Sequence, residues 1–92
     1  SYTSLQETDL RFANLVNAKY VPQQFRFAKS LFKTDFSNAD WSNSDLKQMN
    51  LSGAILSNAK LQNCELAHVN FDSCNLDGAD LRFSRYREDD LS

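Results

Sequence analysis

Long apolar runs are missing from this sequence of 92 residues. No stretch approaches the ~20 apolar residues of a membrane-spanning helix, and the first residues lack the pattern of a signal peptide. The chain begins with Ser1 rather than methionine, which indicates a processed or partial product. With 41% hydrophobic and 24% charged residues, the composition is that of a soluble globular protein, and the length fits one domain over residues 1–92.

A strong excess of one charge is also missing, because the formal net charge is −2. Residues 1–35 carry five bases against three acids, which gives +2, whereas residues 36–81 carry two bases against six acids, which gives −4. This distribution contains no basic stripe. Direct nucleic-acid binding is therefore not expected.

Histidine is limited to His68. Because no serine–histidine–acid arrangement can be built around it, we expect no enzyme activity, no catalytic residue and no cofactor. Cys64 and His68 have a spacing that metal ligands use, but the two side chains are predicted to face opposite ways. No metal site is therefore expected.

What the sequence has in abundance is a period of five residues. From residue 36 onward, every fifth residue is large and apolar: Phe36, Trp41, Leu46, Leu51, Leu56, Leu61, Leu66, Phe71, Leu76, Leu81, Tyr86 and Leu91. The residue two before each of these centres is usually small. The first part of the chain has the same rhythm one residue out of phase, and its centres are Leu5, Leu10, Leu15, Tyr20 and Phe25. With Leu31, the centre that follows Phe25, all twelve leucines of the chain occupy repeat centres.

A period of five fits neither of the common secondary structures. On an α-helix, five residues advance by ~500°, so the apolar position would drift around the helix. On an uninterrupted strand, five steps would move the apolar side chain to the opposite face each time. The chain must therefore turn once in every five residues, with polar turn residues outside and the centres inside.

Several of these units resemble the repeats of the pentapeptide-repeat family. The resemblance rests on Ala13-Asn14-Leu15, Ala39-Asp40-Trp41, Ala54-Ile55-Leu56, Ala59-Lys60-Leu61 and Ala79-Asp80-Leu81. It implies an all-β fold, a right-handed quadrilateral parallel β-helix with four pentapeptides per turn and here about four to five coils. The core centres predicted with the most regular spacing are Leu10, Leu15 and the series from Phe36 to Tyr86.

Four pentapeptides per turn would stack residues that are twenty apart. The predicted outward columns are Asp35/Ile55/Asn75, Asp40/Lys60/Asp80, Asp45/Glu65/Arg85 and Asn50/Asn70/Asp90. None of these columns is acidic throughout.

The repeat is interrupted near residues 21–33, where Pro22 falls and the step from Phe25 to Leu31 is six residues. One interpretation is a protruding loop in which Phe27 and Phe32 bind a partner, since insertions in repeat rods often lie on the binding face. The other is a one-residue bulge absorbed at a corner of the coil. We favour the bulge.

The two cysteines, Cys64 and Cys74, both fall on small inward positions, two pentapeptides apart. Opposite walls of one coil discourage a disulfide, so both are expected to be reduced core residues. Reduced cysteines indicate a cytoplasmic protein, although the sequence does not determine the compartment.

Two functional hypotheses follow. The first is a non-catalytic protein-interaction or scaffold module, alone or as a segment of a larger protein, whose partner contacts are Phe27, Phe32, Asp40, Asp45, Glu65 and Asp80. The second comes from the resemblance: some family members mimic DNA and bind type II topoisomerases such as DNA gyrase, as inhibitors or as quinolone-protection proteins. The open end of the coil also allows an end-to-end homodimer.

Overall fold

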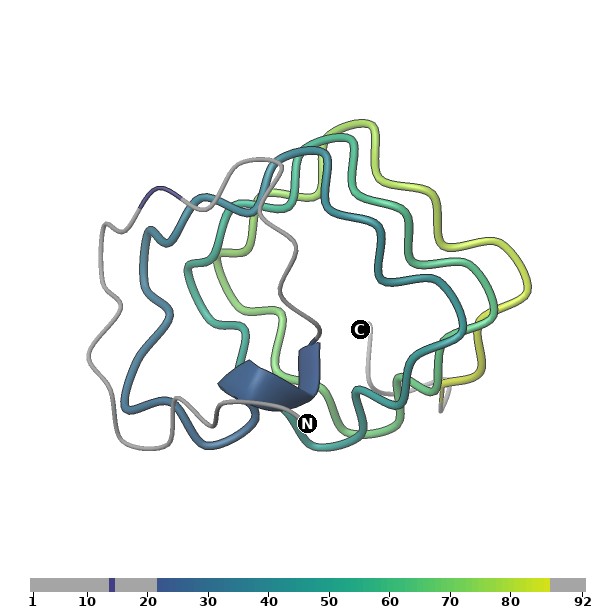
Figure 1. Cartoon of the computed structure of the whole chain (residues 1–92), viewed down its shortest axis with the longest axis horizontal. Coiled ribbons are helices and arrows are strands. Elements are labelled where there is room, and N and C mark those ends of the chain that lie inside the picture. The colour runs from purple at the N-terminus through teal and green to yellow at the C-terminus, as the bar shows by residue number, and fades with distance from the viewer. Residues whose placement is uncertain (1–13, 15–21, 87–92) are drawn as a thin grey trace.

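The protein, for which we analyse a computed structural model, is described at Asn14 and at residues 22–86. Within these residues the only helix is the short 3-10 helix η1 (Pro22–Phe25), and the remaining regular structure consists of isolated parallel β-bridges. Figure 1 shows the chain winding in nested coils of similar outline. No helix among the described residues is long and apolar enough to cross a membrane.

The bridges join residues that are twenty apart, as Asp35 to Ile55 and Ile55 to Asn75 illustrate. Backbone hydrogen bonds alternate along this contact: the Phe36 N–H donates to Ile55 O at 2.7 Å, and the Ile55 N–H donates to Thr34 O at 2.9 Å. Twenty residues are four pentapeptides. The bridges therefore confirm the twenty-residue register that the resemblance to the pentapeptide-repeat family implied.

Each pentapeptide ends in a tight turn with the same backbone conformation. For the centres from Leu31 to Leu81, the second residue after the centre has a positive φ between 58° and 74°, at Lys33, Asn38, Asn43, Gln48, Gly53, Asn58, Asn63, His68, Ser73, Gly78 and Phe83. With the hydrogen bond from the Thr34 N–H to Leu31 O at 3.0 Å, this is the pattern of a type II turn. Asparagine and glycine are common there because they tolerate the left-handed region.

The Asp or Asn before a repeat centre stabilises the turn that follows. Its side-chain oxygen accepts a hydrogen bond from the backbone N–H two residues later, for example from Ser42 to Asp40 at 3.2 Å and from Ser52 to Asn50 at 3.1 Å. The same contact occurs at Asp35, Asp45, Asn70, Asn75 and Asp80. The acidic and amide residues of the repeat thus have a local structural role.

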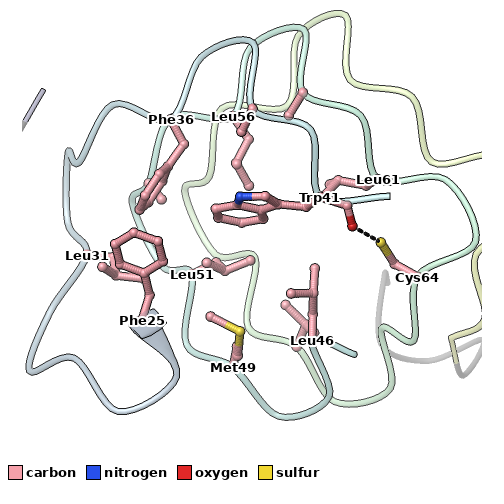
Figure 2. Close-up of a cluster of buried hydrophobic side chains, with 14 of the residues drawn as sticks. Phe25, Leu31, Phe36, Trp41, Leu46, Met49, Leu51, Leu56, Leu61 and Cys64 are labelled. Atoms are coloured by element: carbon pink, nitrogen blue, oxygen red, sulfur yellow. Dashed lines mark hydrogen bonds between the residues drawn. The ribbon is translucent and has the colours of Figure 1, made fainter. Parts of the chain in front are cut away.

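The repeat centres fill the interior of the coils (Figure 2). The buried centres are Leu31, Phe36, Trp41, Leu46, Leu51, Leu56, Leu61 and Leu66. Phe25, which begins the six-residue step, joins the same core: its ring lies 4.9 Å from Phe36 and 6.3 Å from Trp41, between ring centroids.

Burial decreases toward the last described coil. Phe71, Leu76 and Leu81 are only half-buried, and Tyr86 is 48% exposed. The prediction that Tyr86 is a core centre is therefore wrong: no described residue stacks on it from a following coil. Leu10 and Leu15 lie outside the described residues.

Helix η1 accommodates the interruption of the repeat. Asn14 bridges to Asp35, twenty-one residues away instead of twenty, so one extra residue lies between these coils. Both Pro22 and Phe25 are buried. Phe25 thus keeps a place in the core although one extra residue lies in this part of the chain.

The four-pentapeptide coil defines four outer faces. The outward residues are Asp35, Ile55 and Asn75 on the first face, Asp40, Lys60 and Asp80 on the second, Asp45, Glu65 and Arg85 on the third, and Asn50 and Asn70 on the fourth. Turn residues form the corners between them.

Candidate functional surface

The interior of the described coils is packed by apolar side chains that form one cluster. Every buried side-chain nitrogen or oxygen among the described residues has a hydrogen-bond partner. No group of three or more histidine, cysteine or acidic side chains in the described part of the chain could hold a metal ion. The groups available for recognition are therefore on the outside.

The two cysteines are free thiols at inward positions on opposite sides of the coil. Cys64 is buried, and its Sγ donates a hydrogen bond to Trp41 O at 3.0 Å (Figure 2). Burial raises the pKa of the Cys64 thiol, and burial raises the pKa of Cys74 to about 11. A neutral thiol is a poor nucleophile, so both serve as packing residues.

On the second face, Asp40 and Asp80 are engaged with their own turns. Hydrogen bonds from Ser42 lower the pKa of Asp40. Asp80 forms a two-pronged ion pair with Arg82, at 2.8 Å between Nη2 and Oδ2, and hydrogen bonds from Arg82 hold the pKa of Asp80 well below its usual range. Lys60 stacks between the two acids.

The acids of the third face are also paired. Arg85 forms an ion pair with Glu65, and Asp45 lies 3.9 Å from both Arg26 Nη2 and Lys47 Nζ. The four predicted acidic contacts, on the second and third faces, are thus brought onto neighbouring sides of the coil. Basic residues interrupt both columns, so the described acids do not form a continuous negative face.

The two predicted aromatic contacts are both on the surface, Phe27 at 62% and Phe32 at 42% exposure. Phe32 lies over Gly53 of the next coil, where an added Cβ would overlap its ring atom Cδ1. The Lys33 ammonium lies 5.7 Å from the Phe32 ring centroid. The absence of a side chain at Gly53 thus leaves room for one face of the Phe32 ring, and part of that ring remains exposed.

Apart from Phe32, the predicted contacts omitted the residues of the fourth face and its corners. There the exposed lysines are Lys29, Lys33 and Lys47, and the outward amides are Asn50 and Asn70. These residues are seen to group together only when the corner residues, and not just the residues in bridges, are arranged in columns. The twenty-residue register would have allowed this, but the predicted columns covered only the residue before each centre.

The coil geometry agrees with the comparison to known families. The family model for pentapeptide repeats matches residues 30–66 and 54–85, with eight copies, which covers more than half of the chain. The chain belongs to the pentapeptide-repeat family. A search of curated proteins found no match. Family membership accounts for the β-helix type of fold, and the isolated bridges show how this pentapeptide-repeat protein stacks its coils.

Proposed function

We propose that this pentapeptide-repeat protein is a non-catalytic module that binds a protein partner through its outer surface. We further propose that its coils, about four to five in number, wind in the right-handed sense of the family. The observation that carries the functional proposal is the packed interior, in which the centres Leu46, Leu51, Leu56 and Leu61 are each 0% exposed. Chemistry inside a protein needs a cavity that admits a substrate, and a packed coil provides none.

The outer surface supports this proposal because it is both ordered and varied. One outward residue is held in each bridge, and one is fixed in each type II turn. A rigid backbone loses little conformational entropy on binding, which favours recognition by exposed side chains.

The proposal is tested by affinity capture with the intact chain and with variants of each face. The charged residues of one face at a time are substituted. Substitution of the binding face should abolish capture of a specific partner, and substitution of any other face should leave that capture unaffected. Circular dichroism must show that each variant keeps its fold. If all face variants capture the same proteins equally well, the surface is not the binding site and the proposal fails.

Mimicry of DNA toward a type II topoisomerase is the alternative that the family resemblance implied. It requires a continuous acidic face, and the described acids are interrupted by Lys60 and paired with Arg82 and Arg85. We therefore expect no effect of the protein on DNA supercoiling by gyrase. Inhibition at micromolar concentration would favour the mimic.

We also propose that the end with Leu76, Leu81 and Tyr86 allows two copies to associate. Half-buried centres there leave apolar surface accessible among the described residues. Analytical ultracentrifugation should show a concentration-dependent dimer, weakened by Leu81→Asp. A monomer at all concentrations contradicts this association.

A further inference from the structure

The fourth face differs in charge from the rest of the described surface. The fourth face and its two flanking corners, taken together with the exposed Lys29 of the segment after η1, carry Lys29, Lys33 and Lys47 against the single acid Asp72, which sums to +2. The other described charges are four bases against six acids, which sums to −2. The chain thus separates its charges between faces although its linear sequence shows no basic stripe.

Two of the three lysines of this face, Lys29 and Lys33, form no ion pair with a described residue, and neither does Lys60 on the second face. Arg26, Arg82 and Arg85 each form an ion pair with an acid. Within this face Lys47 is paired with Asp45 at 3.9 Å, the distance at which Arg26 also lies from that acid. The ammonium groups of Lys29 and Lys33 are therefore the ones accessible to an external anion.

The two asparagines add hydrogen-bond donors between these lysines. The Oδ1 atoms of Asn50 and Asn70 accept hydrogen bonds from Ser52 and Asp72 backbone N–H groups, at 3.1 and 2.9 Å. Each oxygen is committed to its turn, so the Nδ2 amino groups are the donors that remain at the exposed surface. Ammonium and amide donors together fit a ligand rich in acceptors, as carboxylates are.

The turns beside the fourth face use residues that are unfavourable for their backbone. Positive φ at the other corners falls on Asn or Gly in all cases but Phe83. At the two corners flanking the fourth face, four of the five such residues are instead neither Asn nor Gly: Lys33, Gln48, His68 and Ser73. Left-handed backbone is costly for such residues, and this kind of strain concentrates at functional sites. The corners beside this face are therefore candidates for a functional role.

Two exposed aromatic rings lie at the same end of this face. Phe27 follows η1, and Phe32 lies at the corner next to Lys33. Exposed aromatic residues beside basic residues are typical anchors of protein interfaces. A partner that fits must carry apolar side chains as well as acids.

We propose that the fourth face docks an acidic protein segment with apolar side chains, whose carboxylates contact Lys29, Lys33, Lys47 and the amides of Asn50 and Asn70. A nucleic acid fits less well: a charge of +2 is small for a polyphosphate, and the chain as a whole is negative at −2. This inference rests on the proposed function and names the partner class and the face.

The probe is a short fluorescein-labelled peptide that alternates glutamate with leucine and phenylalanine. Its binding to the intact chain is followed by fluorescence anisotropy, and a peptide with glutamine in place of glutamate is the control. We expect the glutamate peptide alone to bind, with an affinity that falls as salt is added. Equal binding of the glutamine peptide, or no binding of either, overturns the inference.

Lys33→Asn is the most informative variant, because asparagine suits the positive φ of 61° and removes only the charged chain. Its matched control is Lys60→Asn on the second face. We expect Lys33→Asn to weaken the peptide by about two- to fivefold, as the loss of one exposed charge contact does, and Lys60→Asn to leave it unchanged. The triple change Lys29→Gln, Lys33→Asn and Lys47→Gln should weaken it by roughly tenfold or more.

Nuclear magnetic resonance locates the binding independently of affinity. The side-chain amides of Asn50 and Asn70 should shift on addition of the peptide, and those of Asn38 and Asn58 should not. Shifts confined to other faces, or equally tight binding of an oligothymidylate, contradict the inference. If capture of a partner depends on another face, this inference is contradicted, but the proposed function as a protein-binding module remains intact.

Discussion

Arg26 closes the gap that the interruption of the repeat opens in the backbone ladder. In the later coils, the carbonyls of Glu65 and Ala67 accept hydrogen bonds from backbone N–H groups of the preceding coil. The equivalent carbonyls one coil earlier belong to Asp45 and Lys47, and both accept from the Arg26 guanidinium, at 2.6 Å from Nη1 to Lys47 O. The backbone N–H of Arg26 is turned to Gln23 O instead.

Replacing Arg26 by alanine removes both hydrogen bonds. Hydrogen bonds to charged groups contribute ~1.5–3 kcal/mol each, but water can reach these carbonyls, so ~1 kcal/mol each is appropriate. The ion pair with Asp45 adds little, because the Asp45 side chain is 52% exposed. We expect Arg26→Ala to lower the free energy of unfolding by about 2 kcal/mol, and Arg26→Lys, which keeps one donor group, by about 1 kcal/mol.

Urea unfolding followed by fluorescence of Trp41, the single tryptophan, measures these changes. Trp41 is buried beside Phe25 and Phe36, so its emission reports the coil that Arg26 joins to η1. Lys29→Ala is the matched control, because it removes a nearby positive charge that makes no ion pair with a described residue. If Arg26→Ala and Lys29→Ala unfold at the same urea concentration, the guanidinium does not replace the missing ladder donors.

Three further predictions concern the turns, the core and the thiols. Phe83→Asn should raise the free energy of unfolding by about 1 kcal/mol, because Phe83 is 75% exposed at a φ of 64°; a urea midpoint below that of the wild type contradicts this. Leu56→Ala should cost about 3 kcal/mol and the half-buried Leu81→Ala clearly less; equal losses would show that burial does not decrease toward the last described coil. Cys74 should react with iodoacetamide with a midpoint near pH 11, and Cys64 only after unfolding, whereas a Cys74 midpoint near the ordinary value of ~8.5 refutes its burial. Because the folded pKa of Cys74 is raised, its contribution to stability should be complete below pH ~8.5 and decline as the pH rises toward 11.

The inward side chains could be predicted because a large apolar residue at every fifth position must point into the coil. The register came from the resemblance to the pentapeptide-repeat family, whose four pentapeptides per turn imply the columns Asp35/Ile55/Asn75 and Asp40/Lys60/Asp80 that the bridges form. Tyr86 follows the repeat pattern in sequence, but no described coil lies beyond it to cover its side chain. Its burial was therefore mispredicted. Periodicity marks which side chain points inward, but stacking neighbours determine whether it is buried.

The functional surface was harder to predict from the repeat. Arg26 acts through a side chain in a segment where the period fails, so no column contains it. Lys33 and Lys47 are turn residues at different corners, and they flank one face only once the corners are placed in space. Asp40 and Asp80 were predicted to contact a partner because they are charged. The hydrogen bonds that they accept from Ser42 and Arg82 instead give them local roles.

The twenty-residue register underlies every assignment of a residue to a face, and its hydrogen bonds can be observed directly in solution. Scalar couplings across hydrogen bonds, measured by nuclear magnetic resonance, identify each donor nitrogen and acceptor carbonyl. We predict couplings from Leu51 N to the Asn70 carbonyl and from Lys60 N to the Ala39 carbonyl, whose donor–acceptor distances are 2.9 and 2.8 Å. Couplings from these two nitrogens to carbonyls at another spacing would contradict the four-pentapeptide coil, and with it the grouping of Lys33, Lys47, Asn50 and Asn70 around one face.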